Sequence, residues 1–355
     1  MGLLSNFIKN KDQKVIGVDI GSSSVKIVQL HKTSGKVYLD SYGEFSLASY
    51  VNKVVGQATS LPIEKIVAGT SSLLLDSNIN TKVAGMAIPF RSSMVSLIKM
   101  PKVPEKQLNE MVPIEARKYI PSSLDEVTLD WSVIGTTEVS GVEQLKILLV
   151  AIHNNIIEKY KQISEGVKLD ILFYEIEVFS AARALLNTDF SKPSIIIDMG
   201  ANSTNFYVIL EGNIEVSHTI GRGSQDISAA ISKSSGLDIK EAEMVKRDIG
   251  LSKNNPNIKK AVEMNLEYIF AEIERMITNY QNKNSLAIDE VILSGGGSAL
   301  KGLGEFVSER LSIKTRVARP FDSVIAPEFL QETLSEIGPS FSVAVGVALR
   351  GLQDN

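Results

Sequence analysis

Two segments of the chain share the same alternation of apolar runs and polar turns. In the first, Val15–Asp19 and Val25–Leu30 are β-branched apolar runs on either side of a glycine–serine turn. In the second, Ser194–Asp198 and Asn205–Leu210 flank a turn that repeats the aspartate, the glycine and a hydroxyl residue at the same spacing. Apolar runs on both sides of such a turn predict a β-hairpin. We therefore expect two related hairpins, roughly half the chain apart.

The segment between the two hairpins has a different pattern of apolar and polar residues. A short apolar run predicts a strand at Lys65–Ala68. From Met86 to Val167, three stretches that read as strands surround a stretch that is helical in composition. Pro113 lies inside that helical stretch and is expected to kink or restart the helix. Because this block has its own strands and helix, we interpret it as an inserted subdomain.

Helical periodicity dominates the chain after the second hairpin. Gln225–Ser234 is helical in pattern. A longer helix follows, in which these apolar residues recur at helical spacing: Ile258, Val262, Leu266, Ile269, Ile273, Ile277 and Tyr280. The stretch "DEVILSGGGSALKGL" then predicts a buried strand, a triple-glycine turn and a helix start. In "FSVAVGVALRGL" the small residues Ala344, Gly346 and Ala348 suit close helix packing. These elements indicate an α/β protein with compact, interleaved domains.

The composition narrows the classes of function. Of 355 residues, 44% are hydrophobic and 22% charged, and the net charge is −4, which gives no footprint for nucleic acid. The sequence has no cysteine and three scattered histidines, which excludes disulfides and thiolate metal sites. No run approaches the ~20 apolar residues of a membrane span. We expect a cytoplasmic protein, with the apolar Leu3, Leu4, Phe7 and Ile8 docking onto protein rather than lipid.

The two repeated turns carry the chemistry expected of a phosphate site. An aspartate at the end of a buried strand can hold a hydrated divalent cation, while the N–H and hydroxyl groups of the turn face an anion. One such turn is also common in ordinary hairpins. Two related copies that face each other across a cleft would grip the phosphates of one nucleotide. The candidate ligand-binding residues are Asp19, Gly21, Ser22, Ser23, Ser24, Asp198, Gly200, Asn202, Ser203 and Thr204, with Mg²⁺ held through water at Asp19 and Asp198.

Further candidates lie near these turns in the predicted elements. Lys26 follows Asp19 by seven residues and can reach a phosphate as a point charge, although a solvated strand lysine is the alternative. Gly295, Gly296 and Gly297 permit close backbone approach to a flat ligand at the start of a helix; a tight strand-to-helix turn is the alternative. Glu243 and Lys246 share one helical face, where a surface salt bridge is the ordinary expectation.

In this order the motifs resemble those of the actin-like ATPase superfamily. "DIGSSSVK" resembles its first phosphate motif, "DMGANSTN" the second and "LSGGGSALKG" the adenosine motif. "EVFSAARAL" and "FSVAVGVALR" are similar to the two connecting motifs, and "AEMVKRDIG" resembles the segment that supplies Glu243 and Lys246 to the adenosine. The resemblance implies binding of ATP with Mg²⁺. It also places Gly223 at a phosphate loop, where relatives usually have a glycine pair and this chain has Gly223–Ser224.

The inserted block makes the resemblance more specific. "AIPFRSSMVSLIKMP" and "EARKYIPSSLDEVTLDW" are similar to the extra subdomain of the PilM family of type IV pilus assembly proteins, which the division protein FtsA also has. The resemblance implies a duplicated actin-like (ribonuclease H-like) α/β fold with two lobes around a nucleotide cleft. It divides the chain into subdomain 1A (1–85, completed by about 168–192 and 335–355), the inserted subdomain 1C (86–167), subdomain 2A (193–226, completed by about 285–334) and subdomain 2B (227–284).

The function implied by this resemblance is that of a scaffold at the inner-membrane platform of the pilus machine. It would bind ATP and the cytoplasmic N-terminal tail of a PilN-type membrane protein, in a groove between the first subdomain and the insertion. Other platform proteins and assembly ATPases are further expected partners; nucleic acid is not. The protein would be cytoplasmic and recruited to the membrane through this partner.

Catalysis depends on one position. Glu177 matches the water-orienting glutamate of relatives that hydrolyse ATP, although Glu175 could compete for the role and a helix-surface carboxylate is the ordinary alternative. We expect weak ATPase activity or none. Two other functions stay open on the same fold. A sugar or acetate kinase would need a substrate base, for which no aspartate stands in a matching motif. An FtsA-like membrane tether usually carries a basic amphipathic helix after a linker, whereas "RGLQDN" follows the last motif directly.

Overall fold

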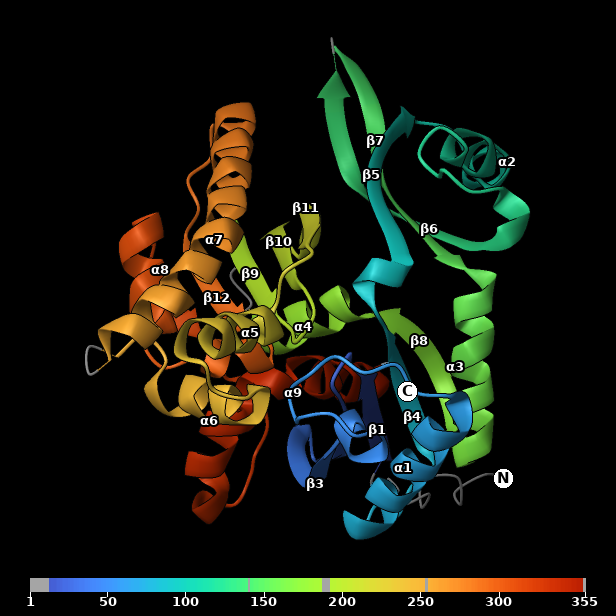
Figure 1. Ribbon diagram of the computed structural model, residues 1–355. Helices are drawn as coiled ribbons and strands as arrows, with labels where there is room; N and C mark the ends of the chain where they lie inside the picture. The colour runs from blue at the N-terminus through green and yellow to red at the C-terminus, as the bar shows by residue number, and fades with distance from the viewer. Residues whose placement is uncertain (1–12, 140, 187–191, 253–254, 354–355) are drawn as a thin grey trace, which may run out of the picture.

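The computed structural model describes residues 13–139, 141–186, 192–252 and 255–353. Leu3, Leu4, Phe7 and Ile8 lie outside this range. Figure 1 shows two halves side by side, with a further sheet standing above the first half. None of the described helices combines the length and the apolar character that a membrane crossing requires.

The two halves contain sheets of the same topology. In the first sheet the order is β3-β2-β1-β4-β8, and in the second it is β11-β10-β9-β12-β13. In each, three antiparallel strands continue into two parallel ones. The strands of the first sheet are β1 (Gln13–Ile20), β2 (Ser24–Thr33), β3 (Lys36–Ser46), β4 (Val83–Ile88) and β8 (Asp170–Ile176). Those of the second are β9 (Ser194–Met199), β10 (Thr204–Leu210), β11 (Asn213–Ile220), β12 (Glu290–Ser294) and β13 (Thr315–Val317).

The repeated sequence pattern therefore forms repeated structure. Strands β1 and β2 pair as a hairpin, and β9 and β10 pair in the same way, as the alternation predicted. Asp19 lies opposite Lys26 in the first hairpin, and Asp198 lies opposite Asn205 in the second. The duplication thus extends from the turns to the register of the strands.

Helices cover both faces of each sheet. On the outer face of the first sheet these are α1 (Ile63–Asp76) and α3 (Asn154–Val167). On the outer face of the second they are α5 (Ser224–Ser235), α6 (Ile239–Ile249), α7 (Pro256–Asn284) and α8 (Leu303–Leu311). The inner faces of both sheets are covered by α4 (Glu177–Leu185) and α9 (Gln331–Gly351). Short 3₁₀ turns are η1 (Leu47–Tyr50), η2 (Phe90–Ser92), η3 (Leu124–Glu126), η4 (Gly296–Ala299), η5 (Pro320–Ser323) and η6 (Glu328–Leu330). All seven periodic apolar residues predicted for the long helix are buried in α7, which confirms that helix.

Helix α9 joins the two halves. It packs against β1 and α4 of the first half and against β12 of the second (Figure 1). Its small residues permit this approach: a side chain at Gly346 would overlap the carbonyl oxygen of Ser180, and one at Gly17 would overlap that of Ala344. The core around α9 contains buried residues of both sheets, among them Val15 and Ile196. The predicted close helix packing is therefore confirmed.

One predicted element is wrong. Lys65–Ala68 was expected to be a strand, but these residues lie inside α1. The buried residues of this helix are Ile66, Gly69, Thr70 and Leu73, a spacing of three to four that is helical rather than alternating. A run of four residues is too short to show this spacing.

The inserted block contains a three-stranded antiparallel sheet in the order β5-β7-β6. Its elements are β5 (Ser93–Pro101), α2 (Glu105–Ala116), β6 (Val127–Val139) and β7 (Val142–His153). Helix α2 packs on one face of the sheet around Ile98, Val112 and Ile147, and it contains Pro113 in its last turn without a restart. The ends of the predicted block belong to the first half instead: Met86 lies in β4, and Tyr160 of α3 lies in the core with β1.

Candidate nucleotide-binding site

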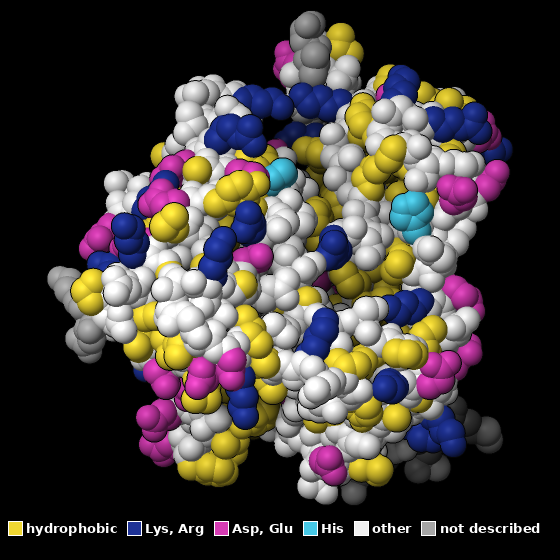
Figure 2. Space-filling view, viewed as in Figure 1, with side chains coloured by type: hydrophobic (Ala, Val, Ile, Leu, Met, Phe, Trp, Pro, Cys, Tyr) yellow, Lys and Arg dark blue, Asp and Glu magenta, His cyan; other side chains and the backbone are white. Residues whose placement is uncertain are grey.

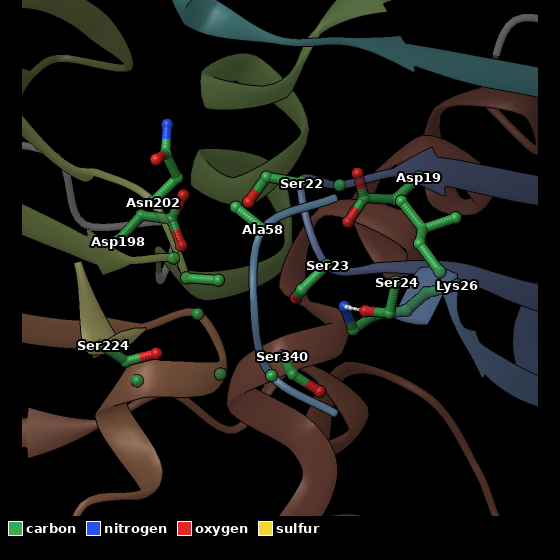
Figure 3. Close-up of a pocket in the computed structure, with 18 of the residues that line it drawn as sticks. Asp19, Ser22, Ser23, Ser24, Lys26, Ala58, Asp198, Asn202, Ser224 and Ser340 are labelled. Atoms are coloured by element: carbon green, nitrogen blue, oxygen red, sulfur yellow. Dashed lines mark hydrogen bonds between the residues drawn. The ribbon is translucent and has the colours of Figure 1, made fainter. Parts of the chain in front are cut away.

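A cavity of about 1150 Å³ lies between the two halves. Its walls are formed by both hairpin turns, the glycine-rich turn after β12 and part of α6. Figure 3 shows Asp19 and Ser22 to Ser24 on one side of this pocket and Asp198 with Asn202 on the other. The two repeated turns therefore face one shared space.

The two turns have the same internal geometry. The backbone N–H of Gly21 donates to the carbonyl oxygen of Ser24 at 3.0 Å, and that of Gly200 donates to the carbonyl oxygen of Ser203 at 2.9 Å. A Cβ atom at either glycine would stand only 3.2 or 3.1 Å from the same carbonyl oxygen. Glycine therefore keeps each turn tight, and the remaining turn residues are presented to the cavity.

Three carboxyl groups line the cavity, and burial raises the pKa of each. Burial is the largest cause that raises the pKa of Asp19 to about 6; the charge of Lys26 opposes it and that of Asp198 adds to it. Burial also raises the pKa of Asp198, against a hydrogen bond from Asn205. Burial, followed by the charges of Asp198 and Asp19, raises the pKa of Glu177 to about 8. Burial therefore makes the ionised form of each of these carboxyl groups costly.

A hydrated divalent cation suits these groups. Within the described ranges, no three His, Cys, Asp or Glu side chains converge as a metal-binding group, so the chain offers no complete ligand cage. Magnesium commonly keeps several waters and is held by one or two carboxylates together with phosphate oxygens. Asp19 and Asp198 supply two such carboxylates from opposite walls. The donor set therefore suits Mg²⁺ that binds together with a phosphate ligand.

Lys26 is not a solvated strand residue. Only 8% of its surface is exposed, and its Nζ donates to Ser24 Oγ at 2.7 Å and lies 3.4 Å from a carboxylate oxygen of Glu44. Figure 3 shows its amino group beside the first turn. Its positive charge therefore stands at the wall of the cavity that carries Ser22 to Ser24.

Glu243 and Lys246 form a buried ion pair, not the surface salt bridge that their spacing suggested. Lys246 Nζ lies 2.7 Å from Glu243 Oε2, and both side chains are more than 90% buried. Ser228 and Arg247 also donate to Glu243. Burial alone raises the pKa of Glu243, but Lys246 and these hydrogen bonds outweigh it and hold the pKa below its ordinary value. The pair presents a fixed polar edge to the cavity.

The three glycines after β12 have different environments. Gly295 has a φ of +80°, and a side chain there would overlap Oδ1 of Asp198. A side chain at Gly297 would overlap Met199. At Gly296 the nearest atom to an added Cβ is 4.0 Å away, so this position opens onto the cavity. Two glycines thus let the turn approach β9 closely, and the middle one leaves space for a ligand.

The structure separates the roles of the two neighbouring glutamates. Glu177 begins α4, lines the cavity and accepts hydrogen bonds from Asn205 Nδ2 at 3.2 Å and from the backbone N–H of Phe90. Glu175 lies in β8, outside the cavity lining, where Arg183 at 2.7 Å and Arg350 at 2.9 Å bind its carboxylate. Glu175 is therefore a packing and ion-pairing residue, while Glu177 is placed to act on a ligand.

Two of the candidate residues do not line the cavity. Thr204 is fully buried, and its hydroxyl donates to the carbonyl oxygen of Arg222 at 2.8 Å. Gly223 lies against the second turn, where a side chain would overlap the carbonyl oxygen of Ala201. Its neighbour Ser224 lines the cavity instead. The other candidates named from the sequence all lie in the cavity wall.

Sequence reasoning missed a segment that crosses the cavity. This strap, residues 51–60, follows η1 and reaches from the first half to the second (Figure 3, at Ala58). The backbone N–H of Ala58 donates to Gln225 Oε1 at 3.0 Å, and Gln225 Nε2 donates to Asn202 Oδ1 at 3.0 Å. The backbone N–H of Thr59 donates to the carbonyl oxygen of Ser22 at 2.8 Å. The strap therefore connects the two phosphate turns.

Other cavity residues were also missed. Asn205 could have been found, because it follows Asp198 by seven residues as Lys26 follows Asp19. Arg91, Lys159 and Tyr160 come from the two connections of the inserted block and carried no sequence signal. Their position in the cavity depends on the fold of the whole chain.

The comparisons with known proteins agree with this architecture. The family model described as type IV pilus assembly protein PilM matches residues 17–352. A solved structure described as the PilM-PilN type IV pilus biogenesis complex has 25% identity and a TM-score of 0.81, and the match covers 95% of this chain and 98% of that one. The cell division protein FtsA of Bacillus subtilis (strain 168) is 20% identical over 369 residues, with 90% of this chain and 82% of FtsA covered.

More distant structures share the fold alone. MreB 5 of Spiroplasma citri bound to AMPPNP has a TM-score of 0.56 at 15% identity, over 97% of this chain and 98% of that one. The ethanolamine utilization protein EutJ of Carboxydothermus hydrogenoformans has a TM-score of 0.58 at 17% identity, over 95% and 89% of the two chains. The predicted actin-like fold is therefore confirmed. With a family model matched along almost its whole length, this chain belongs to the PilM family of type IV pilus assembly proteins.

Proposed function

We propose that this chain is an ATP-binding scaffold of the pilus assembly platform, which binds Mg²⁺ with the nucleotide and captures the cytoplasmic N-terminal tail of a PilN-type membrane protein. In this proposal the protein is cytoplasmic and reaches the inner face of the membrane through that partner. Other platform proteins and assembly ATPases are further proposed partners.

One observation carries the nucleotide proposal: two turns of the same geometry face one cavity, and each turn follows a carboxyl group whose pKa is raised by burial. The backbone N–H and hydroxyl groups of Ser22 and Ser23 on one side, and those of Ser203 with the backbone N–H and amide of Asn202 on the other, suit phosphate oxygens. Lys26 adds a fixed cation. Mg²⁺ would supply charge neutralisation of the phosphates, held through water at Asp19 and Asp198.

The nucleoside is proposed to lie toward the glycine-rich turn. Gly296 leaves open space beside the cavity, and the buried pair of Glu243 and Lys246 offers fixed hydrogen-bonding groups nearby. A fold relative, MreB 5 of Spiroplasma citri, has been solved with AMPPNP and with ADP. A purine nucleotide of this size fits a cavity of about 1150 Å³.

Weak turnover or none follows from the state of Glu177. In the ligand-free cleft its carboxyl group already accepts hydrogen bonds from Asn205 Nδ2 at 3.2 Å and from the backbone N–H of Phe90. A carboxyl group engaged in this way is less free to orient an attacking water. We therefore expect a steady ATPase rate below ~1 per second, the lower part of the usual enzyme range. A faster rate that Glu177→Ala abolishes would place the chain among true ATPases.

The partner tail is proposed to bind the insertion on the sheet face opposite α2. On this face Val95 pairs with Val150, and Leu97 pairs with Leu148 in the register of β5 and β7. All four side chains are only half-buried; Val95 and Val150 also pack against the core around α9, which leaves Leu97 and Leu148 as the pair for a ligand. Figure 2 shows a hollow with hydrophobic walls between the insertion and the body of the protein. A short tail that is disordered when free can place a few apolar side chains against such cross-strand pairs.

A PilN-type tail is the proposed occupant of this face, because the solved complex with 25% identity contains PilM together with PilN. We propose that the groove has this face as one wall and the body of the protein as the other. The insertion proper is then residues 89–153, since β4 and α3 at its two ends pack in the first half. Moderate affinity, about micromolar or −8 kcal/mol, is expected for a tail that becomes ordered on binding.

Two calorimetric titrations test the proposed function. ATP with Mg²⁺ is titrated first, and then a synthetic peptide of the cytoplasmic tail of the PilN-type protein encoded beside this chain. Leu97→Asp should abolish peptide binding and leave ATP binding unchanged, because Leu97 lies outside the nucleotide cavity. Val142→Asp is the matched control, an exposed valine of the same sheet. Wild-type peptide affinity in a folded Leu97→Asp variant would contradict the groove, and absence of ATP binding would contradict the nucleotide site.

A further inference from the structure

The inserted subdomain meets the nucleotide cavity at both of its connections. The incoming connection contributes Pro89, Arg91 and Ser92 to the cavity wall, and the outgoing helix α3 contributes Lys159 and Tyr160. The insertion is therefore attached to the protein at the nucleotide site itself.

The incoming connection is held firmly in place. The Phe90 ring is buried and meets the ring of Tyr207 on β10 edge-on, with centroids 5.1 Å apart. The backbone N–H of Phe90 also stabilises the ionised form of Glu177. The next residue, Arg91, thus has a fixed backbone, while its own side chain is exposed.

Most positive charges in the cavity wall already have partners. Seven lysines and arginines of the described residues line it. Five of them are bound to protein groups: Lys26, Lys53, Lys246, Arg247 and Lys301. Within the described part of the chain, Arg91 and Lys159 have no hydrogen bond or ion pair, and neither is among the residues with an unspecified interaction. These two cations are available to an anionic ligand.

Of these two cations, Arg91 is the better candidate for contact with a phosphate between the two turns. The charge of Arg91 acts on Glu177, and Glu177 is itself within the field of both Asp19 and Asp198. No such effect of Lys159 is found on these carboxylates. Arg91 also directly follows the residue whose N–H binds Glu177, so it enters the cavity wall beside Glu177.

We propose that Arg91 binds the terminal phosphate of a bound nucleoside triphosphate. The incoming connection of the insertion would then distinguish ATP from ADP. This inference rests on the proposed function and adds a residue and a form of regulation to it. The planar guanidinium group offers paired N–H donors that match phosphate oxygens. Only Ser92 separates Arg91 from β5, and β5 carries Leu97 of the proposed tail groove. The same contact would therefore couple nucleotide state to the groove.

Calorimetry with Mg·ATP and Mg·ADP tests the inference on the full chain. Arg91→Ala should weaken ATP binding by about tenfold or more, the usual effect of losing a charge-assisted hydrogen bond, and change ADP binding less than threefold. Arg91→Lys should recover part of the lost ATP affinity, because lysine keeps the positive charge but lacks the paired N–H donors of the guanidinium group. Arg275→Ala, an exposed arginine of α7 outside the cavity, is the matched control and should bind both nucleotides as wild type does.

The outcomes separate the inference from the proposed function. Equal weakening of ATP and ADP in Arg91→Ala, or no weakening of either, would overturn the role of Arg91 and leave the nucleotide site standing. Failure of the wild-type chain to bind both nucleotides would overturn the two together. A thermal melt of each variant confirms that the fold is retained, and Arg91→Gln replaces Arg91→Ala if the alanine variant melts early.

Discussion

Asn205 lies opposite Asp198 across β9 and β10 at the register position that Lys26 occupies opposite Asp19 across β1 and β2. The two halves use this shared position differently. Lys26 brings a positive charge to the first turn, while the amide of Asn205 donates to Glu177 and hydrogen-bonds Asp198. A duplicated scaffold thus has a cation beside the turn in one half and a bridge between two carboxyl groups in the other.

The first prediction concerns the carboxylate of the first turn. Asp19→Asn removes a charge from the proposed Mg²⁺ site without changing the volume, so Mg·ATP affinity should fall about tenfold or more. The fold should persist, since a buried carboxylate that lacks compensation does not stabilise the empty cleft. Calorimetry measures the affinity, and Asp170→Asn at the exposed start of β8 is the control. Wild-type Mg·ATP affinity in a folded Asp19→Asn variant would contradict a nucleotide held with Mg²⁺ between the two turns.

A second prediction uses the open space at Gly296. Valine there should fill part of the cavity and weaken ATP binding at least tenfold, because an added Cβ meets no protein atom closer than 4.0 Å and the side chain extends into the cavity. Gly304→Val in α8 is matched, since its added Cβ also has 4.0 Å of clearance. Melting temperatures and ATP titrations are compared. Retained ATP affinity in Gly296→Val would place the nucleoside elsewhere.

A third prediction follows from the raised pKa of Glu177. Its pKa is about 8 in the folded protein against 4.5 ordinarily, so the folded state holds more protons between these pH values. Stability of the metal-free and nucleotide-free protein should therefore fall as pH rises from 5 to 8. Glu177→Gln cannot titrate, and its melting temperature should fall less over the same range. Melting in EDTA across this range measures both proteins; parallel curves would contradict the assignment.

A fourth prediction concerns the insertion as a removable unit. Ser93 and Ile152 are partners in the register of β5 and β7, so residues 94–151 can be replaced by a two-residue Asn-Gly turn between them. The shortened chain should fold, bind ATP with wild-type affinity and lose the tail peptide completely. Arg91 and the core residue Tyr160 are retained. Peptide binding by the folded, shortened chain at unchanged affinity would exclude the insertion as a wall of the groove.

The fifth prediction concerns the strap. Gln225→Ala removes the acceptor of the Ala58 N–H, which is one neutral hydrogen bond between the halves. A loss of that size should accelerate release of a fluorescent ATP analogue about fivefold in stopped-flow measurements. Gln162→Ala on the exposed side of α3, whose amide donates only to Glu158, is the control. If the strap does not retain nucleotide, the two variants will release it at the same rate.

The sequence predicted elements whose signal is local. Periodicity identified α7 completely, and the repeated aspartate-glycine pattern identified both hairpins. The same method failed at Lys65–Ala68, where a run of four residues is too short to separate strand from helix. The boundaries of the inserted block at Met86 and Val167 were drawn from a change in composition, but membership in a sheet depends on pairing. Such pairing is a long-range property.

The candidate site divides in the same way. The residues of each turn follow one another in the sequence, so their shared chemistry could be recognised from the sequence alone. Ala58, Arg91 and Lys159 reach the cavity only because distant segments cross there, and an isolated lysine or arginine gives no sign of it. Burial also changed the interpretation of Glu243 and Lys246, whose spacing alone is typical of a solvated helix face.

The packing of α9 between the halves sets an order for folding during synthesis. One face of β1, with Val15 and Gly17, is covered by Ala344 and its neighbours, which the ribosome makes more than three hundred residues later. The inner face of the second sheet, with Ile196 and Ile292, belongs to the same core. Each sheet therefore keeps one apolar face exposed until α9 has left the ribosome, and the first sheet waits longest. The stage just before α9 emerges is thus the one at which chaperone protection matters most.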